Sequence, residues 1–167
     1  AAPINDKRTK METVVTASPL FVTLAHASTI VDATLAAGRR ANLQPLTAVV
    51  LDAGGHIVAC KREDASGIVR FEVAFGKAWA ALGMGRPSRD FEAMAQTRPT
   101  FVSSLSSAAG GRFVPVPGGV LVLGDGGRII GAVGVSGDTS DADETAAIAG
   151  IHAAGLASNP AQPPGKA

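Results

Sequence analysis

Four cations in the middle of the chain belong to the residue types that bind carboxylates. They are Arg62, Lys77, Arg86 and Arg112. Arginine offers a planar fork of N–H donors that matches a carboxylate, and a lysine among apolar neighbours can be desolvated into a general base or a carbonyl-polarising cation. One hypothesis is therefore a catabolic enzyme, an isomerase, tautomerase or hydrolase, that acts on a small conjugated organic acid. In this hypothesis Arg62 and Arg86 anchor the carboxylate, and Lys77 is the acid–base group.

Lys77 also has a purely structural interpretation, in which its ammonium pairs with Asp64 or Glu72. Other catalytic patterns are missing from the sequence. It contains no Gly-x-Ser-x-Gly nucleophile elbow, and its three histidines lack the H-x-x-x-H or H-E-x-x-H spacing of metal ligands. We therefore expect neither a serine-histidine-acid triad nor a bound metal ion.

A ladder of glycines, Gly131-x-x-Gly134-x-x-Gly137, precedes an acidic stretch. This spacing differs from the G-x-G-x-x-G of a dinucleotide-binding loop, and the carboxylates that follow would repel a phosphate at the same helix terminus. Ser140 and Asp143 instead resemble a helix capping box. Because glycine within a strand commonly marks a close approach by a ligand or by backbone, Gly131 and Gly134 predict a floor without side chains. Either a flat ligand or a partner subunit could pack on that floor.

Apolar residues at helical spacing predict the helices that position these groups. The predicted helices span 18–41, 70–84, 88–96 and 139–156. Ser18 is expected to cap the first helix and Ser88 the third. The serine-rich stretch 103–107 is expected to form a loop over the sheet.

Two similar hairpins predict the sheet itself. In each, two β-rich runs are joined by an Asp/Gly turn, Asp52-Ala53-Gly54-Gly55 in the first and Gly124-Asp125-Gly126-Gly127 in the second. Helix, hairpin, helices, hairpin and helix in this order predict an α+β fold. We expect a single domain whose five-stranded antiparallel sheet, of the profilin or PAS type, is flanked by helices.

The composition bounds the partners and the domain organisation. The 15 basic and 14 acidic side chains give a formal charge of +1, so neither nucleic acid nor an anionic membrane is indicated. No apolar run reaches the ~18–20 residues of a membrane-spanning helix. We expect a flexible N-terminal extension over 1–17, one folded domain over 18–157 and a flexible tail over 158–167. A cytoplasmic location is preferred, with export open if Ala1 is a processed N-terminus.

Several segments of this chain resemble sequence motifs of the GlcG/HbpS family. That family is also related to the C-terminal domain of PduO-type proteins. The segments are the hairpin VVLDAGGHIVACKRED, the middle segments Lys77-Ala78 and Arg86-Pro87-Ser88, and the C-terminal run from Gly118-Gly119-Val120 through GRIIGAVGVSG to DADE and Ala149-Gly150. The resemblance extends from Leu20 to Leu156. The chain departs from the family pattern at Glu63, where the family often has methionine.

The resemblance implies a haem-binding protein, with haem degradation as a further activity, and assembly into dimers or larger rings. Other members of the family act in catabolic pathways on small organic acids, so the enzyme hypothesis stays open beside it. A haem slot would lie between the first helix and the glycine-bearing strand, with His26 as the ligand of the iron. The other cofactor-binding residues would be Gly119, Gly131, Gly134, Ser136 and, for the propionates, Arg112. A third hypothesis is an interaction module whose helices and glycine strand mainly assemble a homo-oligomer.

Overall fold

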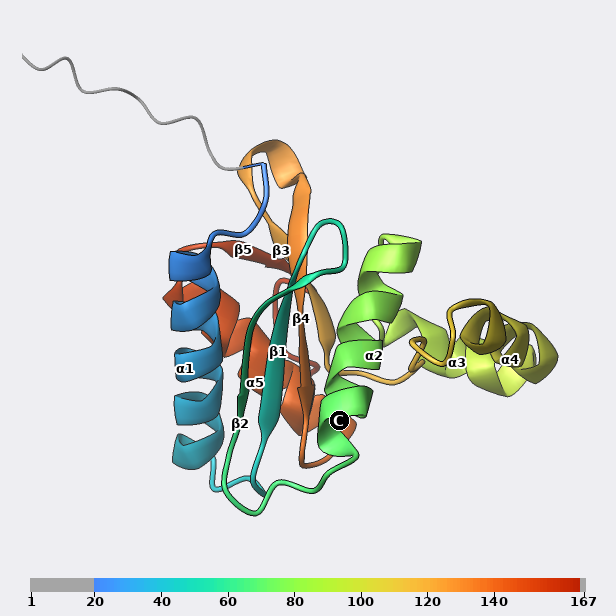
Figure 1. Cartoon of the computed structure of the whole chain (residues 1–167), viewed down its shortest axis with the longest axis horizontal. Helices are drawn as coiled ribbons and strands as arrows, with labels where there is room; N and C mark the ends of the chain where they lie inside the picture. The colour runs from blue at the N-terminus through green and yellow to red at the C-terminus, as the bar shows by residue number, and fades with distance from the viewer. Residues whose placement is uncertain (1–19, 166–167) are drawn as a thin grey trace, which may run out of the picture.

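A five-stranded antiparallel sheet, in the order β2-β1-β4-β3-β5, forms the centre of the molecule (Figure 1). The computed structural model describes residues 20–165. Its strands are β1, Thr47–Asp52; β2, Ile57–Arg62; β3, Gly119–Leu123; β4, Ile129–Ser136; and β5, Ala157–Asn159. The predicted α+β fold with a five-stranded antiparallel sheet is therefore confirmed.

Both predicted hairpins are present. The Asp52 carboxylate closes the first turn by accepting hydrogen bonds from the backbone N–H groups of Gly54 and His56, at 2.8 and 3.0 Å. A short 3₁₀ turn, Asp125–Gly127, joins β3 to β4. The hairpins meet where β1 pairs with β4, and Gly134 of β4 lies between partners on both sides of it. Gly134 is thus at the centre of the sheet.

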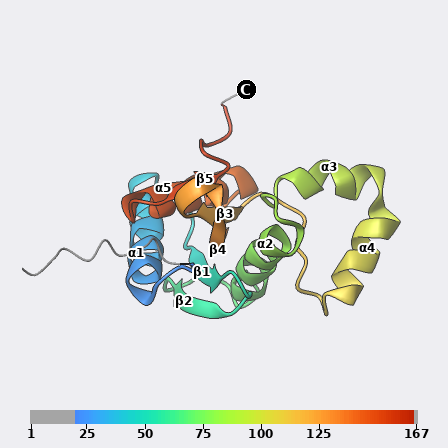
Figure 2. The same cartoon turned by 90° about the horizontal axis from the view of Figure 1, so that it is seen from above.

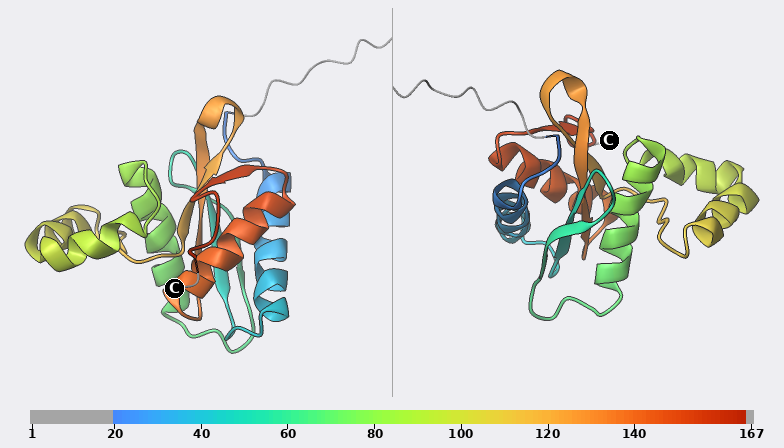
Figure 3. Two further views of the ribbon diagram at one scale, coloured as in Figure 1. Left: turned by 180° about the vertical axis from the view of Figure 1, so that it is seen from behind. Right: turned by 45° about the horizontal axis from the view of Figure 1, so that its top comes forward.

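Helices cover both faces of this sheet (Figure 2). On one face α1, Leu24–Arg40, lies beside α5, Ser140–Ala153, which crosses the strands (Figure 3). α2, Arg70–Met84, covers the opposite face. α3, Asp90–Thr97, and α4, Pro99–Ala108, extend beyond α2 as a separate lobe. Within residues 20–165 no helix is both long and apolar enough to cross a bilayer.

The central strands are apolar on both sides because helices cover both sides. Val50 and Val133 point toward α1 and α5, whereas Val49 and Ala132 point toward α2. Strand residues alternate between the two faces, so each central strand contributes to two separate apolar clusters. The two helical layers are therefore held by the same short strands.

The first helix begins later than its apolar spacing predicts. Its N-cap is Thr23, whose hydroxyl oxygen accepts from the backbone N–H of His26 at 3.1 Å. The preceding Val22 donates its backbone N–H to the Ile130 carbonyl at 2.9 Å, which ties the segment to β4 and keeps it out of the helix. The expected cap, Ser18, lies outside the described residues.

The lobe corrects two expectations from the sequence. Ser88 does not cap a helix: its hydroxyl is buried, donates to the Val116 carbonyl and accepts from the Gly119 N–H, both at 2.7 Å. The serine-rich stretch 103–107 is not a loop over the sheet but part of α4. Packing of Phe91 against Phe113, with ring centroids 5.2 Å apart, holds this lobe together, and a local pattern does not reveal such packing.

The chain also enters the sheet once more after its last helix. β5 pairs with β3, with Ala157 opposite Leu123 and Asn159 opposite Leu121. Residues 158 and 159, assigned from the sequence to a flexible tail, are therefore strand residues.

Candidate functional site

Lys77 lies on the side of α2 that faces the sheet, and its side chain is only 2% exposed. Its ammonium donates hydrogen bonds to the Val135 carbonyl and to the Asp143 carboxylate, both at 2.9 Å. The partner is thus Asp143, not Asp64 or Glu72 as the sequence interpretation had it. The fold brings the first turn of α5 to the middle of α2.

Burial governs the electrostatics of the Lys77–Asp143 pair. It lowers the pKa of Lys77, although the charge of Asp143 acts in the opposite direction, and it raises the pKa of Asp143 against the charge of Lys77. Removal from water disfavours the charged form of either group, and only the partner makes both charges tolerable in the interior. The pair therefore fastens α2 to α5 and has almost no surface on which a substrate could bind.

Arg62 and Arg86 lie toward opposite ends of α2. Arg62 donates to the Ser66 carbonyl at 2.7 Å, whereas Arg86 pairs with Asp90 at 3.0 Å, just beyond the C-terminus of α2. The polar hollow that Arg62 lines includes neither Arg86 nor Lys77. The structure does not bring these three cations into one cleft.

The glycines of the central strands are covered. A Cβ atom at Gly134 would overlap the carbonyl oxygen of Ala74 in α2, and one at Gly119 would overlap the carbonyl oxygen of Lys77. Gly131 lies against the segment that precedes α1. The expected open floor is therefore wrong: Gly119 and Gly134 let the backbone of α2 lie directly on the strands, and Gly131 is covered by the side chain of Val22.

The remaining predicted cofactor residues do not share a site. Ser136 is fully buried at the end of β4, where its hydroxyl accepts from Arg70 at 3.3 Å. The guanidinium of Arg112 stacks on Trp79 of α2, 4.8 Å from the ring centroid. Because α1 and α2 cover opposite faces of the sheet, Arg112 and His26 lie on opposite sides of the molecule (Figure 2).

His26 lies in the first turn of α1 and is half-buried. Its Nδ1 atom is buried and has no hydrogen-bond partner among residues 20–165. The large apolar side chains that flank it in the sequence are exposed, Leu20 at 65%, Phe21 at 59% and Leu24 at 67%. His26 thus has an unpaired buried nitrogen, and three of its neighbours in the sequence expose large apolar side chains.

A second buried acid in the stretch after the glycine ladder was not found from the sequence. Glu144 is 0% exposed, and its carboxylate accepts from Arg89 Nε at 2.8 and 3.0 Å. The N-cap of α5 is Thr139, not Ser140 in a capping box. The sequence shows several acidic residues at the start of this helix. Acidic residues are also common at helix N-termini that are exposed to solvent, so the burial of Glu144 could not be deduced from the sequence.

The pKa of Glu144 gives a test of this burial. Burial raises it above the ordinary value of 4.5, although Arg89 acts in the opposite direction. A raised pKa means that the folded protein holds the proton more tightly than the unfolded chain, so stability falls as pH rises from 4.5 through the raised pKa. Glu144→Gln removes this titration. In urea unfolding, the free energy of unfolding of the wild type should therefore fall relative to that of Glu144→Gln as pH rises from 4.5 toward neutrality, and a pH-independent difference between the two proteins would contradict this.

We compared the sequence and the fold with those of known proteins. The profile of a family described as haem-degrading protein HbpS-like matches residues 22–152. Curated protein sequences give no significant match. Among solved structures, a PduOC–haem complex has 23% identity and a TM-score of 0.73, and covers 81% of this chain and 96% of its own.

Two further structures are similar over most of the chain. The Klebsiella pneumoniae protein ORFY has 24% identity and a TM-score of 0.72, covering 80% of this chain and 90% of its own. HbpS has 26% identity and a TM-score of 0.69, covering 79% and 89%. The structural likeness shows a shared fold, and the profile match extends from the segment before α1 into the last helix. The chain therefore belongs to the HbpS-like haem-degrading protein family.

Proposed function

We propose that this protein binds haem, with His26 as the protein ligand of the iron. The observation that carries the proposal is the buried, unpartnered Nδ1 of His26. A buried polar atom without a partner costs free energy, so His26 is a residue whose side chain a bound group could complete. Membership of a haem-degrading family, and the haem complex of the structurally similar PduOC, support haem as that group.

The surroundings of His26 suit an apolar, planar ligand. Leu20, Phe21 and Leu24, which are near it in the sequence, are each more than half exposed. Contiguous exposed apolar surface on a soluble domain commonly marks a binding site. The hydrogen bond from Val22 to Ile130 holds this segment against β4, so the apolar side chains are positioned relative to the imidazole. Bound haem would supply an iron centre for redox and oxygen chemistry.

The propionates would need partners other than the predicted one. Arg112 stacks on Trp79 of α2, the helix on the face of the sheet opposite α1. Gly131, which was expected to line the slot, is covered by the segment before α1. The proposal therefore retains His26 as the iron ligand. The apolar segment that precedes α1, and not the glycines of β4, would contact the haem.

Titration with hemin, followed by the Soret band, tests this proposal. The wild-type protein should give a saturable shift, and His26→Ala should weaken binding by at least the roughly 10–100-fold that loss of a supporting partner costs at metal sites. His56→Ala is the matched control, because His56 is an exposed histidine at a hairpin turn beside Asp52. An unchanged Soret shift in His26→Ala would remove His26 as the ligand, and no saturable shift in the wild type would remove haem binding.

Acid–base catalysis at Lys77 on a small organic acid has less support. The Lys77 ammonium is committed to Asp143 in the interior, and Arg62 and Arg86 lie elsewhere. Assembly into a homo-oligomer stays a prediction.

A further inference from the structure

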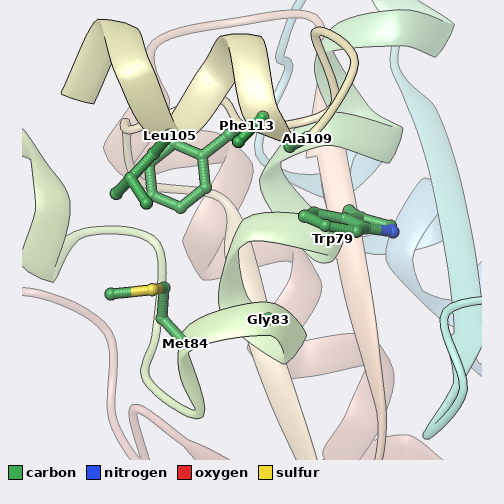
Figure 4. Close-up of a pocket in the computed structure, with 7 residues that line it drawn as sticks. Trp79, Gly83, Met84, Leu105, Ala109 and Phe113 are labelled. Carbon is green, nitrogen blue, oxygen red and sulfur yellow. The ribbon is translucent and has the colours of Figure 1, made fainter. Parts of the chain in front are cut away.

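An apolar pocket lies between α2 and α4, on the side of the sheet opposite α1 (Figure 4). Its volume is about 220 Å³. In the close-up of Figure 4, Leu105 and Phe113 lie together on one side, Trp79 lies to their right and Met84 lies below them. Small residues leave the space open, because Gly83 and Ala109 also line it. The pocket is thus a gap that the chain's own side chains do not fill.

One cation is fixed beside this apolar pocket. Arg112 follows α4, and its guanidinium lies 4.8 Å from the centroid of the Trp79 ring. Its Nε donates to the Ala109 carbonyl at 2.8 Å. Both contacts are to residues that line the pocket. Stacking on an aromatic ring and one hydrogen bond to backbone reduce the freedom of the arginine side chain.

Nothing in the described part of the chain neutralises this arginine. Arg112 is exposed, and among residues 20–165 no carboxylate forms an ion pair with it. The terminal nitrogens of a guanidinium donate in a fork that fits a carboxylate. The charge, the stacked ring and the apolar walls together define an amphipathic site.

We propose that this pocket binds a small apolar monocarboxylate, whose hydrocarbon part lies among Trp79, Leu105 and Phe113 and whose carboxylate meets Arg112. Its volume falls below the roughly 300–1,000 Å³ of sites for drug-sized ligands, which sets the size of the acid. The site is separate from His26, so it neither requires haem nor competes for the same residues.

The fluorescence of Trp79 reports on this pocket directly. The chain contains one tryptophan and no tyrosine, so the tryptophan fluorescence of the protein comes from Trp79 alone, a residue that lines the pocket. The probe is 3-phenylpropionate, and its uncharged match is 3-phenylpropionamide. We expect saturable quenching by the acid at a concentration about tenfold lower than by the amide, because a hydrogen bond to a charged group is worth that much.

Two variants and one control separate the contribution of the arginine from that of the apolar pocket. Arg112→Gln should abolish the preference for the acid over the amide while leaving the amide bound. Arg98→Gln is the matched control: Arg98 also stacks on an aromatic ring, 4.2 Å from the centroid of Phe101, but Phe101, unlike Trp79, does not line the pocket. Ala108→Phe, at an exposed position that lines the pocket, should fill the space and weaken both ligands.

Clear results would overturn the proposal. Equal affinity for acid and amide in the wild type would show that Arg112 does not meet the ligand. Quenching that never saturates, or that survives Ala108→Phe unchanged, would show that the probe binds elsewhere. A rise in mass by light scattering that Ala108→Phe prevents, without saturable quenching, would assign the pocket to a second copy of the chain instead. The hemin titration is independent of all these outcomes.

Discussion

Lys77→Met is expected to lower the free energy of unfolding by about 3–5 kcal/mol, the usual cost of removing one partner from a buried ion pair. The variant keeps an unbranched apolar side chain, so the loss comes mainly from charge. Asp143 would be left 1% exposed without its cation, and the Val135 carbonyl would lose its donor. Urea unfolding followed by circular dichroism measures the difference.

Two companion variants show whether burial is the cause. Lys77→Met combined with Asp143→Leu should recover most of the loss, because no uncompensated charge then remains in the interior. Lys61→Met removes a similar contact at the surface, where Lys61 pairs with Asp32 and both side chains are more than half exposed. That change should cost less than about 1 kcal/mol. Equal losses at Lys77 and Lys61 would contradict the buried pair.

Gly134→Ala is expected to destabilise the protein by about 1–3 kcal/mol or more, because overfilling a packed interior forces backbone to move. The added Cβ atom would overlap the Ala74 carbonyl oxygen and lie 3.0 Å from the Cβ atom of Ala78. Both contacts belong to α2, so the helix would be lifted from the centre of the sheet. The same unfolding measurement applies.

Gly67→Ala provides the control for this change. Gly67 is exposed, its nearest neighbour would be the Arg70 Cγ atom at 3.9 Å, and it has no positive φ angle that an alanine would resist. The expected effect is within about 0.5 kcal/mol. Wild-type stability in Gly134→Ala would mean that α2 does not rest on β4 as described, and the explanation of the glycine ladder would fail with it.

Local patterns predicted the elements whose signals are local. The bounds of α2 agree with the apolar spacing over 70–84, and the helix ends at Gly85, which adopts the left-handed conformation that glycine favours. Both hairpins follow from their Asp/Gly turns. By contrast, α4 was missed because its serines are typical of loops, and only its packing in the lobe makes it a helix.

The sequence also predicted only part of the candidate site. The residue types of His26 and Lys77 marked them as groups of interest, but their roles depended on what lies beside them. The unpaired Nδ1 of His26 and the Asp143 partner of Lys77, 66 positions away, are visible only in three dimensions. The pocket at Trp79 carries no sequence signal, because it arises from a gap between two helices.

The sequence by itself determined the two hairpins, the helix that covers them and the family to which the chain belongs, because turn chemistry, residue alternation and motifs act over a few neighbouring positions. Only the tertiary structure decided that the glycines of the central strands lie under backbone, and that the cations expected in one cleft are kept apart. These outcomes depend on distances between elements that are remote in the chain, and packing of the whole domain sets those distances.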